Sequence, residues 1–181
     1  LKKTGFPIHD SDKLISKMYE NPNKAFVSFL HKNLTKEIVK NNKINKKKIT
    51  NIIFNNKQTK KKLEQYIHRE VKASRERFIK KNIKTKKGII FTDIPLLLEN
   101  NLEKNFDVVV CIISKKKIRT ERVLKNKKFT QKILNKIFKS QTTDKQRRAR
   151  SQIIINNNKT KKDFIFSAEK ALMRFIKWEK L

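Results

Sequence analysis

The stretch FTDIPLLLE, residues 91–99, decides the fold of this chain. It ends an apolar run with an acid, Asp93, and continues through a proline and three leucines to a second acid, Glu99. The run GIIFTD at 88–93 and a second run, VVVCII at 108–113, are almost continuously apolar. Such runs are typical of strands in a parallel sheet that is covered on both faces.

Helical periodicity surrounds these strands. FPIHD at 6–10 predicts a short first strand that ends at Asp10, and residues 153–155 predict a last one. Apolar strands separated by amphipathic helices predict an α/β fold with a parallel sheet. Helices are expected over 11–20, from 21–22 onward, over 44–54, 59–79, 114–124 and 130–140, from about 144, and over 160–178, with Asp10 or Ser11, Ser114 and Thr130 as candidate N-caps.

Polar side chains follow three of the predicted strands at the point where each strand ends: Asp10, Asp93 and Ser114. In open parallel sheets, ligands bind in the crevice beyond the carboxyl ends of the strands. The two aspartates are therefore candidate active-site residues. A turn or a helix-capping role is the alternative for either acid alone.

The chain has 181 residues, with 48 Lys+Arg against 16 Asp+Glu, and one cysteine, Cys111. This length favours one domain. There is no apolar run of about 18 residues and no signal-peptide pattern, so we expect a cytoplasmic protein without a membrane partner. The lysines are spread along the chain and most phenylalanines fall at apolar-periodic positions, so no specific nucleic-acid partner is expected. The arginines gather locally in RRAR at 147–150.

Four segments, taken in order along the chain, together resemble dephospho-coenzyme A kinase, a P-loop kinase of the nucleoside-kinase type. The most specific is FTDIPLLLENNLEKNFDVVVCI, which resembles the family's Asp-x-Pro-Leu-Leu-x-Glu stretch and the strand after it. LEQYIHREV resembles the family's Leu-x-x-x-Leu-His-Pro segment, with Arg69 where proline is usual. The others are GFPIHDSDKLISKMY, which resembles a strand-Asp-x-Asp-helix segment, and IRTERVLKNKKFTQKILNKIFKSQTTDKQRRA, which resembles the lid.

The resemblance implies a single domain built on a three-layer parallel sheet. Residues 1–20 and 88–113 would form its core, and residues 21–87 a helical substrate-binding region. Residues 114–152 would form the lid, and residues 153–181 the C-terminal core strand and helix.

The resemblance also implies ATP-dependent phosphorylation of the ribose 3′-hydroxyl of dephospho-CoA, the last step of coenzyme A synthesis. Asp10 would be the base that deprotonates this hydroxyl. Asp93 would hold Mg²⁺ through water. Arg147 would neutralise charge on the transferring phosphoryl group. Arg148 and Arg150 would only add to the local positive field.

Further candidate residues come from the same resemblance, and most of them have two interpretations. Asp12 would hold substrate or cap a helix. His68 and Glu99 match substrate-side positions, although His68 equally fits a core histidine, and Leu97 with its flanking leucines would form a pocket wall or core. Arg122 would contact nucleotide near the lid hinge or be a plain surface arginine, and Asn157, among three asparagines, could bind the adenine edge.

One family motif does not occur in residues 1–181, the phosphate-binding loop G-x-x-x-x-G-K-[ST]. The two glycines, Gly5 and Gly88, lie outside any such pattern. We therefore expect a chain truncated before or through this loop, without the central strand that precedes it and inactive as written. QIIINNNK at 152–159 also replaces the family's more acidic, glycine-ended segment.

Two rival functions remain open on the sequence. A non-catalytic basic α/β protein would bind RNA or other polyanions, with an affinity that falls steeply with salt. A related P-loop kinase would act on another small hydroxyl compound. The Asp-x-Asp and Pro-Leu-Leu-x-Glu patterns favour dephospho-CoA over that second possibility.

Overall fold

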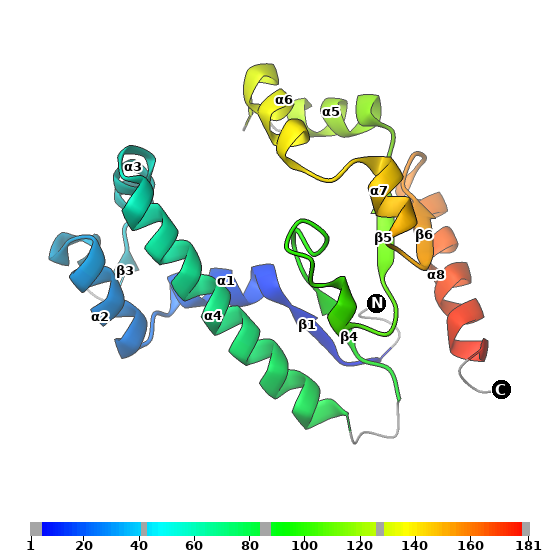
Figure 1. Cartoon of the computed structure of the whole chain (residues 1–181), viewed down its shortest axis with the longest axis horizontal. Coiled ribbons are helices and arrows are strands. Elements are labelled where there is room, and N and C mark those ends of the chain that lie inside the picture. The colour runs from blue at the N-terminus through cyan, green and yellow to red at the C-terminus, as the bar shows by residue number, and fades with distance from the viewer. Residues whose placement is uncertain (1–4, 41–42, 84–87, 126–128, 179–181) are drawn as a thin grey trace. The chain divides into compact units, whose positions relative to one another are not determined.

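The computed structural model describes residues 5–40, 43–83, 88–125 and 129–178, with side chains described up to Arg174 in the last helix. The chain divides into two compact units, Leu1–Pro95 and Leu96–Leu181. Figure 1 follows the helices and strands of both units. Each unit carries a parallel pair of strands, so the predicted parallel α/β fold is confirmed.

The first unit holds one parallel strand pair and a group of helices. β1 pairs with β4 in the register Ile8↔Phe91, His9↔Thr92 and Asp10↔Asp93. The two strands are far apart in sequence, and the connection between them is mostly helical, as parallel pairing requires. The elements are β1 Ile8–Asp10, α1 Ser11–Glu20, α2 Lys24–Asn33, the 3₁₀ turn Lys36–Ile38, β2 Val39–Lys40, β3 Lys43–Ile44, α3 Lys46–Asn55, α4 Lys57–Asn82 and β4 Phe91–Asp93.

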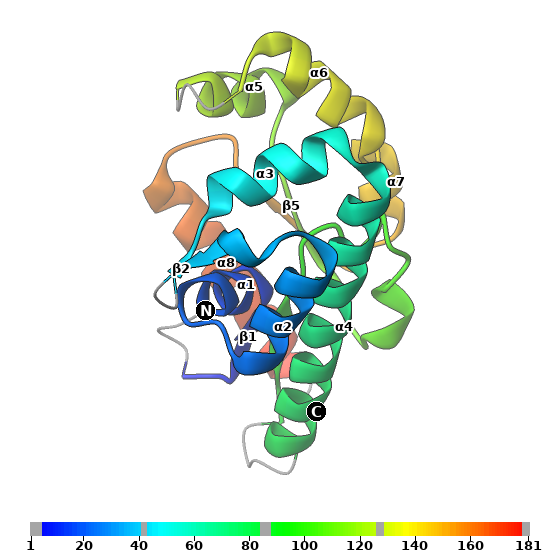
Figure 2. The ribbon, with the colours of Figure 1, turned by 90° about the vertical axis from the view of Figure 1, so that its left-hand side faces the viewer.

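An aromatic and aliphatic core holds the helices of this unit together. Phe26 of α2 stacks on Tyr66 of α4 with ring centroids 5.4 Å apart and meets Tyr19 edge-on at the same separation. Figure 2 shows α2 and α3 lying beside α4, which agrees with the shared core of these helices. Its buried members are Phe26, Leu30, Ile38, Ile49, Leu63 and Tyr66.

The second unit is built on the parallel pair β5 and β6. The register runs from Val110↔Ile153 to Ile113↔Asn156, which confirms the strand predicted at 153–155. Helix α8 packs on β6, and α7 contacts β5. The elements are the 3₁₀ turn Glu103–Asn105, β5 Val110–Ile113, α5 Lys116–Lys125, α6 Gln131–Ser140, α7 Asp144–Ala149, β6 Ile153–Asn156 and α8 Lys161–Trp178.

Two local predictions in this unit are wrong. Val110 and Ile112 of β5 are 37% and 55% exposed, so only one face of this strand is covered within the described residues. Successive side chains of a strand point to opposite faces, which is why Val109 and Ile113 are buried while these two are not. Ser114 does not cap α5, since its buried hydroxyl has no hydrogen-bond partner in the described part of the chain. Thr130 does cap α6, as predicted.

The core predicts a large difference between two identical substitutions. Phe26 is 1% exposed and Phe54 of α3 is 86% exposed. Phe26→Ala should lower the free energy of unfolding by about 3–5 kcal/mol, because it removes two ring contacts and leaves a cavity. Phe54→Ala should change it by less than about 0.5 kcal/mol. Urea denaturation of both variants measures the difference, and equal effects would show that Phe26 is not a core residue.

Candidate active site

Two aspartates lie side by side at the carboxyl end of the β1–β4 pair. Asp10 and Asp93 are register partners on neighbouring parallel strands, which lie about 4.8 Å apart in such sheets. Asp10 is also the N-cap of α1, where its Oδ1 accepts a hydrogen bond of 2.8 Å from the backbone N–H of Lys13. Asp12 follows in the first turn of α1. The structure therefore groups three predicted acids at one strand end.

This grouping makes it electrostatically unfavourable for all three carboxylates to be ionised at once. The pKa of Asp93 is raised, first by partial desolvation of its carboxylate, although the residue as a whole is exposed, and then by the negative charges of Asp10 and Asp12. A cation at this point would relieve the repulsion between the ionised carboxylates.

The carboxylates at this strand end can supply only part of the ligands of a Mg²⁺ ion. Within the described residues, no group of three or more His, Cys, Asp or Glu side chains converges to hold a metal ion. Mg²⁺ is commonly bound through one or two carboxylates while it keeps waters and substrate phosphates as further ligands. Asp93 with Asp10 beside it suits such a shared site, and a fully protein-made metal cage is not seen in this part of the chain.

The structure decides two of the alternatives for residues of the first unit. The capping role of Asp12 is wrong, because Asp10 provides the N-cap of α1. The core role of His68 is also wrong, because His68 is exposed on α4. Substrate contacts of Asp12 and His68 stay predictions.

The buried histidine of this unit is His9, which sequence reasoning did not single out. It is 6% exposed, its Nε2 lies 3.2 Å from Ser74 Oγ, and its ring lies 5.5 Å from that of Phe78. Burial lowers the pKa of His9, and the positive charge of Arg75 lowers it further. The alternation of β1 points to this placement, since successive side chains of a strand point to opposite faces and His9 lies between the less buried Ile8 and Asp10.

In the second unit, the loop after the three leucines is joined to the start of α7. Glu99 Oε1 accepts hydrogen bonds from the backbone N–H of Thr142 at 3.0 Å and from its hydroxyl at 2.8 Å. Burial alone would raise the pKa of Glu99, but these bonds and the charge of Arg147 outweigh it, so the pKa is lowered. Of the leucines, Leu98 is core, Leu97 is half-buried and Leu96 is exposed.

Arg147 is surrounded by acceptors. Its guanidinium lies 3.6 Å from Glu99 Oε1 and 3.5 Å from Asp144 Oδ1. It also donates to the hydroxyl of Thr142 at 3.2 Å and to the side-chain oxygen of Gln141 at 3.3 Å. With 16% of its side chain exposed, Arg147 is a fixed cation rather than a freely moving one.

Arg122 and Asn157 are brought together, as a shared nucleotide role requires. Arg122 of α5 donates to the backbone carbonyls of Asn157 at 2.9 Å and Lys159 at 3.2 Å. The backbone N–H of Lys115 donates to Asn158 Oδ1 at 2.7 Å. These bonds tie α5 to the loop after β6, although Arg122 itself is exposed, and its contact with nucleotide stays a prediction.

Comparison with known proteins identifies the family. A family model described as dephospho-CoA kinase matches residues 1–163. The curated dephospho-CoA kinase of Fusobacterium nucleatum is 31% identical over 173 residues, which cover 94% of this chain and 86% of that protein. The chain belongs to the dephospho-CoA kinase family.

Further relatives agree with this family assignment. The curated dephospho-CoA kinase of Bradyrhizobium diazoefficiens is 27% identical over 156 residues, covering 86% of this chain and 76% of that protein. The solved structure of the dephospho-CoA kinase from Campylobacter jejuni superposes with a TM-score of 0.73 at 23% identity, over 98% of this chain and 89% of that one. The chain is thus a kinase with a P-loop kinase fold. Within its described part, no helix is long and apolar enough to span a membrane.

The acidic strand end predicts a measurable coupling between carboxylates. Asp12→Asn should lower the pKa of Asp93, because it removes one of the negative charges that raise it. Carbon-13 NMR titration of the Asp93 carboxyl follows this change directly, and addition of Mg²⁺ should lower the same pKa.

Glu20→Gln is the matched control, since it removes one negative charge from the other end of α1. It should leave the titration of Asp93 unchanged. A titration of Asp93 that does not move in Asp12→Asn would show that the three acids do not form one electrostatic group.

Proposed function

We propose that the chain transfers the γ-phosphoryl group of ATP to the ribose 3′-hydroxyl of dephospho-CoA. The paired carboxylates Asp10 and Asp93 at the carboxyl end of two parallel strands carry this proposal, in a chain of the dephospho-CoA kinase family. Phosphoryl transfer depends mainly on positioning and on neutralising charge. Carboxylates at this strand end can orient both the acceptor hydroxyl and a metal-bound nucleotide.

Asp10 is the proposed base. Its Oδ1 is held by the Lys13 amide, which fixes the plane of the carboxylate. Its second oxygen has no hydrogen-bond partner among the described residues, so it can accept the proton of the substrate hydroxyl. A base must lie within hydrogen-bond reach of that proton, and a carboxylate anchored at one oxygen is oriented for this task. Asp12 in the following helical turn would hold the ribose.

Asp93 is the proposed metal-side acid, acting through a water molecule. When bound, Mg²⁺ supplies charge neutralisation for the phosphates. The position of Asp93 beside Asp10 supports this assignment, because a cation at this point would stabilise the ionised form of both carboxyl groups.

Residues of the second unit have proposed roles of their own. Arg147 would neutralise charge on the transferring phosphoryl group, and Glu99 would orient it through their ion pair. Because Arg147 already has four acceptors, its approach to a phosphate would require exchange of at least one of them. Arg122 and Asn157 would contact the nucleotide, and Leu97 would contact dephospho-CoA. His68 is proposed separately as a dephospho-CoA contact of the first unit.

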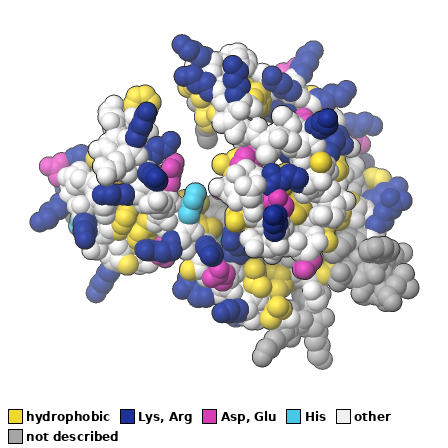
Figure 3. Space-filling model, in the orientation of Figure 1, with side chains coloured by type: hydrophobic (Ala, Val, Ile, Leu, Met, Phe, Trp, Pro, Cys, Tyr) yellow, Lys and Arg dark blue, Asp and Glu magenta, His cyan; other side chains and the backbone are white. Residues whose placement is uncertain are grey.

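Neither the structure nor the comparisons support the non-catalytic alternative or the expected inactivity. Figure 3 shows Lys and Arg spread over the visible face without one continuous basic patch, as solvated surface lysines would be. Polyanion binding by a folded protein is favoured when its positive charge is clustered on one face or along one helix. The kinase is therefore the function that we propose.

Asp10→Asn separates the chemistry from the fold. Asparagine caps helices as well as aspartate does, so α1 should keep its N-cap. Turnover should fall by about 10²–10⁴, because the amide cannot take the hydroxyl proton. The measurement is phosphorylation of dephospho-CoA by Mg²⁺·ATP, with the protein expressed from its complete open reading frame and the 3′-phosphate of the product identified by phosphorus NMR.

Circular dichroism of the variant checks that the fold is intact. An Asp10→Asn enzyme that keeps wild-type turnover would remove Asp10 from the role of base. Wild-type protein that phosphorylates another hydroxyl compound in preference to dephospho-CoA would overturn the proposed substrate.

A further inference from the structure

Arg150 makes a second attachment between α7 and the loop that carries Glu99. Its Nε donates to Glu103 Oε1 at 3.0 Å, and one terminal nitrogen contacts the same oxygen. That terminal nitrogen also donates to Asn101 Oδ1 at 2.7 Å. Arg150 thus binds two residues of one turn, Asn101 and Glu103. This differs from the expectation that Arg150 only adds to the positive field.

The loop end of this attachment is a tight turn followed by a 3₁₀ turn. Asn101 has a left-handed backbone with φ 52°, and Glu103 begins the 3₁₀ turn Glu103–Asn105. The side chain of Glu103 is 16% exposed, and its Oε2 is buried without a hydrogen-bond partner in the described part of the chain. The hydrogen bond from Arg150 is the largest cause that holds the pKa of Glu103 below its ordinary value. Glu103 is therefore charged at neutral pH, and Arg150 is the residue that stabilises this charge.

The helix end of the attachment needs such support. Helix α7 has only six residues, which is far too short to be stable by itself in water. At its start it has a capping box between Thr143 and Gln146, and Glu99 binds the backbone of Thr142 just before it. At its end, Arg150 is the C-cap residue and the anchor to Glu103.

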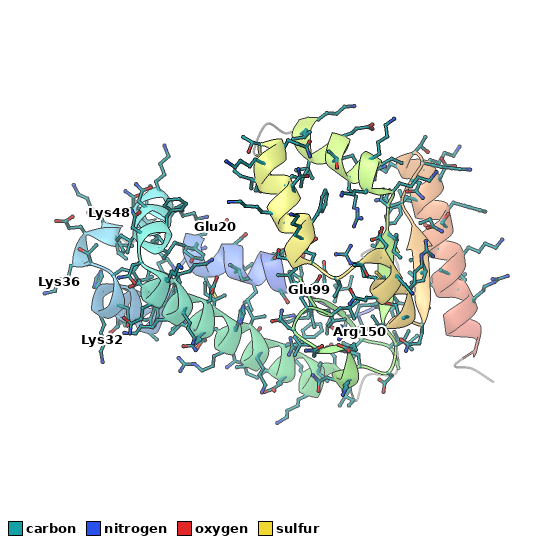
Figure 4. All side chains as sticks on the ribbon, turned by 45° about the horizontal axis from the view of Figure 1, so that its top comes forward. Glu20, Lys32, Lys36, Lys48, Glu99 and Arg150 are labelled. Carbon is teal, nitrogen blue, oxygen red and sulfur yellow. The ribbon has the colours of Figure 1, made fainter. Side chains whose placement is uncertain are left out.

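The two attachments together fix α7 at both ends. Figure 4 labels Glu99 and Arg150, the loop and helix members of the two attachments. A helix held only at its start could still tilt and rotate about that point. Arg147 lies on α7 between the two anchors, so the reach of its guanidinium depends on both of them.

We propose that Arg150 is a positioning residue for phosphoryl transfer, acting through Glu103 and Asn101 to fix α7 and thereby Arg147. This inference rests on the proposed role of Arg147. The ion pair of Arg150 with Glu103 orients the short helix. Arg150 itself is not expected to contact nucleotide or dephospho-CoA.

Arg148→Gln provides a matched control for Arg150→Gln. Arg148 lies on the same helix, is exposed, and has no ion pair or hydrogen bond among the described residues, so both variants remove one positive charge from α7. Arg150→Gln should lower kcat about tenfold while both KM values stay within about twofold, because misplacing Arg147 affects the transition state more than binding. Arg148→Gln should stay within about twofold of wild type in kcat, in the KM for ATP and in the KM for dephospho-CoA.

Glu103→Gln tests the pair from its other side and replaces Arg150→Gln if that variant does not fold. It should lower kcat to a similar extent, and the double variant should lose no more than Arg150→Gln alone, since the two residues act as one unit. Arg150→Lys should recover part of the loss, because lysine keeps the ion pair but not the forked contact with Asn101.

Hydrogen exchange gives a readout that does not depend on activity. The amides of Arg147 and Arg150 should exchange faster in Arg150→Gln and Glu103→Gln than in Arg148→Gln, with no change in β5 and β6. Kinetics of Arg150→Gln equal to those of Arg148→Gln, independent losses in the double variant, or unchanged exchange in α7 would each overturn the proposal. If wild-type protein fails to phosphorylate dephospho-CoA, the proposed function fails, and the exchange data still decide whether Arg150 fixes α7.

Discussion

Parallel strand pairing is the constraint on which the rest of this structure depends. Two parallel strands cannot be joined by a short hairpin, so each pair needs a long connection, which here is largely helical. The same geometry places the carboxyl ends of paired strands at one edge. In the first unit this brings Asp10 and Asp93 together despite their distance in sequence. In the second it brings the end of β5 next to the asparagines that follow β6.

Scarce acids are used where they orient arginines. In the second unit, Glu99 and Asp144 contact Arg147, Asp144 also pairs with Arg119 at 3.1 Å, and Glu103 binds Arg150. These side chains are mostly shielded from solvent, where the planar guanidinium can be held by several acceptors at once. The ion pairs of lysine that the structure describes lie on more exposed positions and contribute little to stability. In these ion pairs, arginine is therefore held at shielded positions by several acceptors, whereas lysine remains on the solvated surface.

The strands and their terminal acids could be predicted because both depend on local patterns. An apolar run that stops at an aspartate shows where a strand ends, and the fold rule then places Asp10 and Asp93 at one edge. The contacts of Glu99 with Thr142 and of Glu103 with Arg150 could not be predicted, because each joins polar residues more than forty positions apart. The sequence also leaves open whether Asp10 or Ser11 is the N-cap of α1. Asp10 and Ser11 can both cap a helix in the sequence, and only the backbone conformation at Asp10 decides between them.

The double use of Asp10 also limits which residues can replace it. One oxygen of its short side chain accepts from the amide three residues ahead, and the other would be left for the proposed proton transfer. Glutamate would keep the charge, but it is not among the preferred N-cap residues and its carboxylate would start one methylene farther away. Asparagine would keep the cap but lose the proton acceptor. Aspartate satisfies helix capping and the proposed proton transfer together, so the two requirements restrict this position only in combination.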